Sequence, residues 1–210
     1  IMLMVDSDTD GSHIRGLLFN LFHTMWPSLL ECNKFMTSML TPIVKVTKGD
    51  KIQQFYNLID YEEWAKTNNN GKGWEIKYYK GLGTSTSQEA KQYFKELKIV
   101  HYKYTEESDK KLDLAFNKQK GKADNRKEWL GSFDKNVILD YSAKEVSYED
   151  FIDKELIHFS NYDVERSIPN ICDGLKISQR KILFGCFKKN LTKEIKVAQL
   201  AGYVSETAAY

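Results

Sequence analysis

The chain has 210 residues, of which 41% are hydrophobic and 13% aromatic, with only 3 prolines and a net charge of +2. This composition is typical of a folded globular protein with one large domain or two small ones. No apolar stretch approaches the roughly 18 residues of a membrane span, and the 3 cysteines follow no zinc or disulfide spacing. We therefore expect a protein of a reducing compartment with no membrane partner.

The small net charge conceals an uneven distribution along the chain. Residues 1–165 hold 23 Lys and Arg against 26 Asp and Glu, whereas residues 166–200 hold 8 against 2. A compact basic block is typical either of a surface that binds a polyanion or of a solvated helix face. Charge alone leaves both interpretations open.

The chain opens with a strand-like segment and a helix-like one. Residues 1–5 are uniformly apolar, as in a parallel strand that is buried on both faces. Apolar residues then recur at helical spacing from Ile14 to Met25, with Ser12 as the expected N-cap. Because the sequence starts inside the predicted strand, we expect it to be a piece of a larger protein.

Three aspartates, Asp6, Asp8 and Asp10, stand on alternate positions between this strand and this helix. In an extended segment alternate side chains point the same way, so the carboxylates would repel one another unless a cation lies near them. The spacing matches the start of a calcium-binding EF-hand loop, but its twelfth position is Leu17, where that loop needs glutamate. Magnesium, held by one or two carboxylates and waters, is the other metal that fits. The alternative without a metal is an acidic turn that caps the helix.

The next part of the chain predicts two strand-containing motifs. Residues 39–58 indicate two strands around a turn at Lys48–Asp50. Residues 74–94 indicate a strand, a glycine turn and a helix, and Thr86 with Glu89 forms the capping box of that helix.

The second half of the chain is predicted to be mainly helical. Residues 103–125 are polar and charged and are expected to form a helical connection. Further helices are expected at 147–159, 177–189 and 195–205, and the last two are joined by a turn at Asn190–Thr192. Such a pair is typical of a helix-turn-helix, although helix pairs are common in other folds.

Three stretches also carry a resemblance to a known family. DSDTDGSHIRGLL at 6–18 and IKYYKGLGTSTSQEAKQYF at 76–94 resemble the Toprim region of type IIA DNA topoisomerases. RSIPNICDGLKISQRKILFGCFKKN, which begins at Arg166, resembles the start of their winged-helix DNA-cleavage domain. The resemblance covers nearly the whole chain and is strongest to the eukaryotic and viral enzymes. It departs from the family pattern at Ile177-Ser178, where Pro-Gly is usual, which affects one helix start and not the domain.

The resemblance implies a fold, an activity and partners. The fold would be an α/β Toprim-like parallel-sheet domain over 1–100, a mostly helical connector over 101–160 and the start of a winged-helix domain over 161–210. The activity would be an ATP-dependent change of DNA topology through transient double-strand cleavage, with phosphotyrosyl bonds and Mg²⁺ at the scissile phosphate. Double-stranded DNA and a second copy of the protein would be partners. The location would be the nucleus for a eukaryotic source, and otherwise a virus or the cytoplasm.

The resemblance also implies roles for individual residues. Asp6, Asp8 and Asp10 match the family's magnesium aspartates, with Asp10 assisting a second metal. The implied DNA-binding residues offer positive charge, polar side chains or glycines that let the backbone approach a phosphate. They are His13, Lys80, Gly81, Gly83, Arg166, Lys176, Gln179, Arg180 and Lys181. The alternative roles are a structural one for His13 and a solvated surface for the cations.

Other parts of the implied enzyme are expected outside these 210 residues, so the chain alone is expected to be inactive. They are a Toprim glutamate, the ATPase domain, the intercalating residue and the nucleophilic tyrosine. Tyr210 follows Ala208 and Ala209, whereas the family's nucleophile follows an arginine, so we expect Tyr210 to pack or position a helix.

Two other functions remain in view. A Toprim-type nuclease or primase would explain residues 1–97 but not the stretch that begins at Arg166. A DNA-binding or calcium-binding module without catalysis is the other alternative, and metal dependence would test it.

Overall fold

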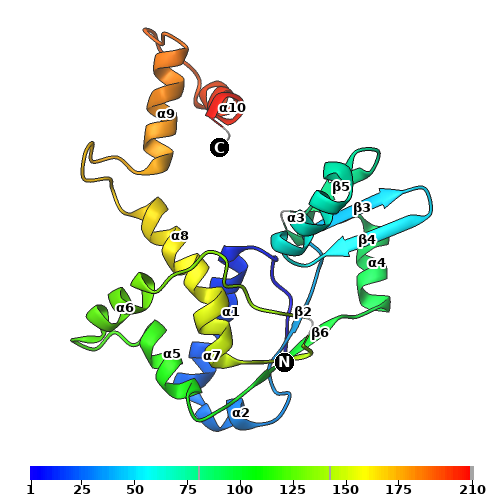
Figure 1. Cartoon of the computed structure of the whole chain (residues 1–210). Coiled ribbons are helices and arrows are strands. Elements are labelled where there is room, and N and C mark those ends of the chain that lie inside the picture. Colours follow the sequence, from blue (N-terminus) through cyan, green and yellow to red (C-terminus); the bar gives the residue numbers. More distant parts are fainter. Residues whose placement is uncertain (80, 142, 209–210) are drawn as a thin grey trace. The chain divides into compact units, whose positions relative to one another are not determined.

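The computed structural model describes residues 1–79, 81–141 and 143–208. The chain divides into two compact units, Ile1–Phe159 (unit 1) and Ser160–Tyr210 (unit 2). Figure 1 shows a sheet with packed helices and a second, smaller sheet in unit 1, and helices in unit 2. Among the described residues, no helix combines the length and the apolar character that crossing a membrane requires.

The main sheet of unit 1 has four strands in the order β1-β2-β6-β7. The strands are β1 (Met2–Leu3), β2 (Thr37–Met39), β6 (Ile99–Lys103) and β7 (Glu145–Ser147). The β1–β2 and β6–β7 pairs are parallel, whereas β2 and β6 run antiparallel. The predicted α/β class is confirmed, with a mixed sheet in place of a wholly parallel one.

The first strand differs from its prediction. It is shorter than residues 1–5 and lies at the edge of the sheet. Leu3 is buried, but Met2 and Met4 are exposed. The prediction of burial on both faces is therefore wrong, because only the face that carries Leu3 is covered.

Helices share one hydrophobic core with this sheet. They are α1 (Thr9–Met25), α2 (Pro27–Glu31), α5 (Ser108–Phe116), α6 (Lys122–Gly131), α7 (Tyr148–Phe151), the π-helical turn η3 (Ile152–Leu156) and α8 (Ile157–Ser167). The predicted helix at 147–159 is confirmed, and the helical connection at 103–125 is interrupted between α5 and α6. Strands β6 and β7 were not predicted.

The core of unit 1 forms around Phe19 on α1, which is fully buried. Its ring meets Tyr102, Tyr148 and Phe151 edge-on, at centroid distances of 4.5, 5.0 and 5.0 Å. Each edge-to-face pair contributes roughly 0.5–1.5 kcal/mol beyond the burial of its surface. These contacts fix α1 against β6 and α7.

The buried face of α1 is not its most apolar one. Ile14, Leu17, Leu21 and Met25 are exposed, whereas the buried positions are Gly11, Ser12, Arg15, Gly16 and Phe19. Small residues let the helix approach its neighbours closely, since a Cβ on Gly16 would lie 3.2 Å from Leu156 Cδ1. The apolar periodicity therefore predicts the helix correctly but not the face that packs.

The smaller sheet of unit 1 is antiparallel, in the order β4-β3-β5. Its elements are β3 (Val44–Lys48), β4 (Lys51–Phe55) and β5 (Glu75–Tyr78), accompanied by α3 (Leu58–Thr67), η1 (Asn69–Gly71), η2 (Leu82–Thr84) and α4 (Ser87–Lys95). The predicted hairpin is confirmed, with Lys48 opposite Lys51 and Gly49 in the turn at φ +56°. The positive φ explains the glycine there.

Unit 2 contains the second part of α8, α9 (Ile177–Lys188) and α10 (Val197–Ala208). Helices α9 and α10 pack closely, because a Cβ on Gly185 would lie 2.8 Å from Val204 Cγ2. Asn190 follows α9 with φ +50°, a left-handed conformation that asparagine tolerates. The predicted helix pair is confirmed.

The capping box of α4 is also confirmed, and it anchors a buried carboxylate. The Thr86 backbone N–H donates to Glu89 Oε2 at 2.8 Å, and Lys77 Nζ pairs with the same oxygen at 2.7 Å. Tyr79 donates its hydroxyl to Glu89 Oε1 at 2.5 Å. Burial alone would raise the pKa of Glu89, but hydrogen bonds from Lys77, Thr86 and Tyr79 outweigh it and lower the pKa to about 2.

This lowered pKa predicts an acid-sensitive contribution to stability. It is present above the unfolded pKa of 4.5 and is lost as the pH falls toward about 2. Glu89→Gln should lower the free energy of unfolding by about 1–3 kcal/mol at pH 7, and this difference should shrink as the pH falls from 5 toward 2. Urea unfolding across this range measures it, with exposed Glu96→Gln as the control. A difference that does not change with pH would contradict the assignment.

Candidate functional site

The turn between β1 and α1 is organised by Asp8, which is the N-cap of α1 in place of the predicted Ser12. Asp8 is extended (φ −128°, ψ 178°), and its Oδ1 accepts a hydrogen bond from the Gly11 N–H at 2.7 Å. Since the helix begins at Thr9, Asp10 lies in its first turn and Asp6 precedes it. The three aspartates therefore do not alternate along one extended segment. The prediction that Ser12 is the N-cap failed because aspartate caps a helix at least as well as serine, and Asp8 stands earlier in the chain.

Asp6 joins this turn to the glycine turn that follows β5. The backbone N–H of Leu82 donates to Asp6 Oδ1 at 2.7 Å, across 76 residues of sequence. A Cβ on Gly81 would lie 2.5 Å from Asp6 Oδ2, and a Cβ on Gly11 would lie 2.0 Å from the Asp6 carbonyl oxygen. The approach at Gly11 is to backbone and requires glycine, whereas a larger residue at Gly81 would have to displace the Asp6 carboxylate. The two Toprim-like stretches thus meet at a single carboxylate.

A cavity of about 810 Å³ opens beside this junction within unit 1. Its wall combines charged side chains with a larger apolar and aromatic surface. The charged and titratable residues are Asp6, Asp8, Arg15, Lys154, Glu155 and His158, and the aromatic ones are Tyr56, Tyr78, Tyr79 and Tyr141. The carboxylates of Asp6, Asp8 and Glu155 give this cavity hard oxygen donors.

A magnesium ion places particular demands on the donor set around this turn. Within residues 1–79, 81–141 and 143–208, no group of three or more Asp, Glu, His or Cys side chains forms a preassembled metal site. Mg²⁺ usually binds through one or two carboxylates and keeps several waters. The Asp6 and Asp8 hydrogen bonds engage Oδ1 of each carboxylate, and both residues are exposed. The pair fits a water-rich Mg²⁺ site but not a cage made of protein ligands alone.

The other sequence-predicted residues of unit 1 lie near this turn or outside the described residues. His13 is half-buried, and its ring stacks on Phe159 at a centroid distance of 4.0 Å and an angle of 10°. Gly83 has open space around it, since a Cβ there would meet nothing within 4 Å. Lys80 and Tyr210 lie outside the described residues.

The predicted arginines of unit 2 have acidic neighbours. Arg180 forms a bidentate pair with Asp173, at 2.8 Å from Nε and 2.8 Å from Nη2. The hydrogen bonds from Arg180 are the main reason that the pKa of Asp173 falls to about 2. Arg166 contacts Asp163 at 3.2 Å and lies over the Tyr162 ring at 4.8 Å. These contacts orient both guanidinium groups.

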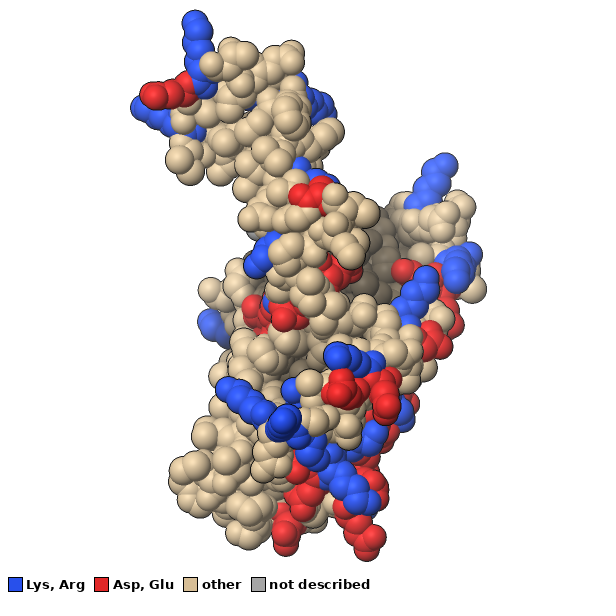
Figure 2. Space-filling view, turned by 90° about the vertical axis from the view of Figure 1, so that its left-hand side faces the viewer, with Lys and Arg blue, Asp and Glu red and all other residues tan. Residues whose placement is uncertain are grey.

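The start of α9 involves two more of the predicted residues. Lys176 is the N-cap position, and its backbone N–H donates to Gln179 Oε1 at 2.8 Å. The Gln179 amide oxygen is thus used within the chain, while Lys181 lies in the first part of α9. In the view of Figure 2, most of unit 2 is uncharged and its charged side chains are mainly basic, whereas charges of both signs intermingle over unit 1.

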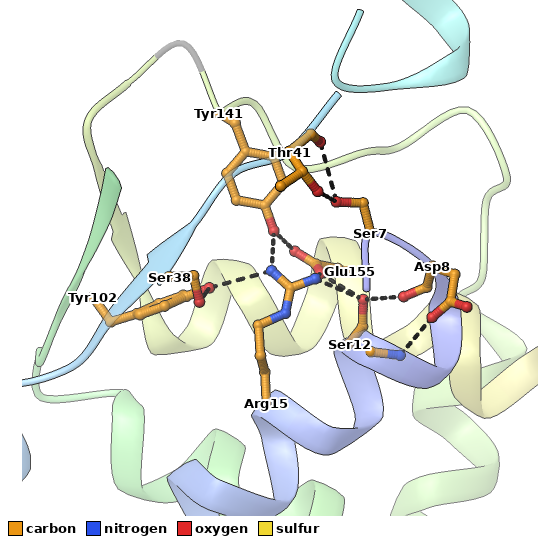
Figure 3. Close-up of polar contacts among 10 residues, drawn as sticks. Ser7, Asp8, Ser12, Arg15, Ser38, Thr41, Tyr102, Tyr141 and Glu155 are labelled. Atoms are coloured by element: carbon orange, nitrogen blue, oxygen red, sulfur yellow. Dashed lines mark hydrogen bonds and ion pairs between the residues drawn. The ribbon is translucent and has the colours of Figure 1, made fainter. Parts of the chain in front are cut away.

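Sequence reasoning missed a buried polar cluster behind Asp8. Arg15, Tyr141 and Glu155 come from three separate segments and contact one another, and Arg15 and Glu155 also contact Ser12 (Figure 3). The one available signal is that Arg15 follows Ser12 by three residues, and so shares its helix face. A buried Arg15 is evident only once α1 is packed.

Comparisons with known proteins agree with these features. The family model of the C-terminal associated domain of TOPRIM matches residues 39–164, and that of DNA gyrase/topoisomerase IV matches residues 166–210. DNA topoisomerase 2 of Plasmodium falciparum is 51% identical over 213 residues, and DNA topoisomerase 2-alpha of Rattus norvegicus is 50% identical over 225. Both alignments cover 100% of this chain, but only 15% and 14% of the relatives.

A solved structure gives the same result in three dimensions. The Plasmodium falciparum topoisomerase II DNA-binding, cleavage and re-ligation domain matches with a TM-score of 0.83 and 51% sequence identity. The match covers 100% of this chain and 29% of that one. The chain therefore spans only a small part of the length of the relatives that it matches.

The tight contact at Gly81 predicts different effects for two nearby glycines. Gly81→Ala places a methyl group against the Asp6 carboxylate and should break its hydrogen bond with Leu82, whereas Gly83→Ala meets open space. Amide hydrogen exchange at Leu82 should therefore become at least about tenfold faster in Gly81→Ala and stay unchanged in Gly83→Ala. Equal exchange rates in the two variants would contradict this geometry.

Proposed function

Because this chain belongs to the DNA topoisomerase 2 family, we propose that it carries the metal-binding turn and a DNA-contacting surface of a type II topoisomerase. The whole enzyme would change DNA topology by ATP-dependent double-strand cleavage, strand passage and religation. The observation that carries this proposal is the junction of Asp6 with the glycine turn, through the 2.7 Å hydrogen bond from Leu82. A Toprim nuclease or primase is not favoured, since residues 166–210 match the DNA gyrase/topoisomerase IV family model.

The metal in this proposal is Mg²⁺, with Asp6 and Asp8 as its nearest ligands and Asp10 assisting a second ion. When bound, Mg²⁺ supplies positive charge that stabilises the scissile phosphate and the leaving sugar oxygen. The chain's own part is to hold the carboxylates. The Leu82 and Gly11 N–H groups each bind an Oδ1, which restricts the rotation of both side chains.

The DNA partner would meet both units of the chain. Gly81 and Gly83 would let the backbone approach a phosphate, with Lys80 adding positive charge and His13 contributing from α1. In unit 2 the phosphate contacts would come from the basic block. Its proposed members are Arg166, Lys176, Gln179, Arg180 and Lys181. Asp163 and Asp173 would hold Arg166 and Arg180 in position for DNA.

Further parts of the proposal concern the longer protein. ATP would bind to a domain outside this chain, the nucleophilic tyrosine would follow beyond Tyr210, and two copies would form a homodimer in the nucleus. The proposed domain limits are 1–100 for the Toprim part, 101–160 for the connector and 161–210 for the start of the winged-helix domain. The chain alone would not cleave DNA.

The first test separates the metal role of Asp8 from its capping role. Asn is as good an N-cap as Asp, so Asp8→Asn keeps the hydrogen bond to Gly11 while removing the charge. In the intact enzyme this variant should lose magnesium-dependent cleavage by at least about a hundredfold, yet bind DNA nearly as well as the wild type. Exposed Asp124→Asn serves as the control. Normal cleavage by Asp8→Asn at ordinary magnesium concentrations would contradict the assignment.

The second test concerns the basic block. Replacing both Lys176 and Lys181 with Ala in the intact enzyme should weaken binding to all duplex sequences alike. The log–log salt slope should also fall by about 0.9 for each phosphate that the protein no longer neutralises. Lys110→Ala, which removes a lysine that is paired with Glu107 in unit 1, should leave the slope unchanged. An unchanged slope in the double variant would assign both lysines to a solvated surface.

A further inference from the structure

A buried polar cluster lies behind the first turn of α1, and the Glu155 carboxylate contacts each of its other members (Figure 3). Arg15 is 6% exposed, and its Nη2 lies 2.5 Å from Glu155 Oε1. Ser12 Oγ lies 2.6 Å from the same oxygen. Tyr141 accepts a hydrogen bond from Arg15 Nη1 at 2.9 Å and donates its own hydroxyl to Glu155 Oε2. Glu155 thus contacts two residues of α1, Ser12 and Arg15.

The Ser12 hydroxyl connects this cluster to Asp8. Ser12 Oγ has one proton to donate and two acceptors within reach, Glu155 Oε1 at 2.6 Å and the Asp8 carbonyl oxygen at 3.1 Å. The carboxylate is nearer and charged, so it takes the proton. The Asp8 carbonyl is then left to the Ser12 N–H, also at 3.1 Å, and this bond closes the first turn of the helix. Glu155 therefore sets the Ser12 side chain and supports the turn that Asp8 caps.

Glu155 also balances a buried positive charge. Burial alone would lower the pKa of Arg15, but Glu155, together with Tyr102 and Tyr141, raises it above its ordinary value, so the guanidinium stays charged. Arg15 and Asp8 line the same cavity. Without Glu155 the Arg15 charge would lack its carboxylate partner and would attract the aspartates, in competition with a metal ion.

The position of Glu155 depends on the π-helical turn η3. Such turns are rare and often occur at functional sites, because the extra residue redirects the side chains around it. Ile152 and Leu156 of this turn lie in the core, and Glu155 contacts α1. Asp153 instead pairs with Lys111 at 2.5 Å, on α5. The turn thus presents two carboxylates to two different helices.

We infer that Glu155 is a positioning residue for the metal site, which holds Ser12 and Arg15 and thereby fixes the Asp8 turn. Glu155 itself binds no metal in this inference. The inference rests on the proposed function, because it takes Asp8 as a ligand of the divalent cation.

The experiment measures metal binding directly. Mn²⁺ alone is titrated into the full-length enzyme without nucleotide, and free Mn²⁺ is followed by electron paramagnetic resonance. Glu155→Gln should raise the dissociation constant about tenfold, the size typical of residues that orient metal ligands. Asp153→Asn is the matched control, because it removes the charge of a carboxylate from the same turn, and it should change the constant less than about twofold. The Mn²⁺ binding that is lost in Asp8→Asn is the binding at the proposed site.

Each outcome has a distinct meaning. If Asp8→Asn loses Mn²⁺ and Glu155→Gln binds it normally, the inference is wrong and the proposed function stands. If Asp8→Asn binds Mn²⁺ normally, the proposed function fails and the inference with it. Should circular dichroism show that Glu155→Gln does not fold, Ser12→Ala decides, since it keeps the Arg15–Glu155 pair. We expect about threefold weaker binding there, the equivalent of one hydrogen bond, and unchanged affinity in folded Ser12→Ala overturns the inference.

Discussion

The ion pair between Arg15 and Glu155 is the constraint on which the turn between β1 and α1 depends. It joins α1 to the π-helical turn η3 inside unit 1, where the side chains of both partners are largely buried. A buried charge is costly unless a partner and hydrogen bonds satisfy it, and here Ser12 and Tyr141 supply those bonds. One turn further along α1, Phe19 packs among three aromatic rings. Together these contacts fix where the helix begins, and therefore where Asp8 lies.

The second constraint is steric and comes from glycine. The Asp6 carbonyl lies so close to Gly11 that no larger residue fits there, and the Asp6 carboxylate would have to move if the residue at Gly81 were larger. Asp6 can therefore accept the Leu82 N–H and still face the cavity that Asp8 lines. The aspartates provide the charge, but the glycines determine how closely the two Toprim-like stretches approach. The proposed metal site would need both parts.

Local signals in the sequence predicted local structure well. The Thr86–Glu89 capping box, the hairpin around Gly49 and the pair of helices α9 and α10 all depend on residues close in sequence, and all are present. Strands β6 and β7 were missed because their pairing partners lie far along the chain. The packed face of α1 was misjudged because Arg15 is buried by an ion pair that no hydrophobic pattern reveals. The motifs pointed to Asp6, Asp8 and Gly81, but Glu155 could not be found without the π-helical turn that directs it toward α1.

The most direct test of the account is anomalous diffraction at the manganese edge, from crystals of the intact enzyme with bound DNA and Mn²⁺. We expect a peak beside the carboxylates of Asp6 and Asp8, at about the 2.0–2.2 Å typical of such small cations. Glu155 should then lie against Arg15 and Ser12 and away from the peak. A peak on Glu155, or none beside Asp6 and Asp8 in crystals that hold Mn²⁺ elsewhere, would contradict it.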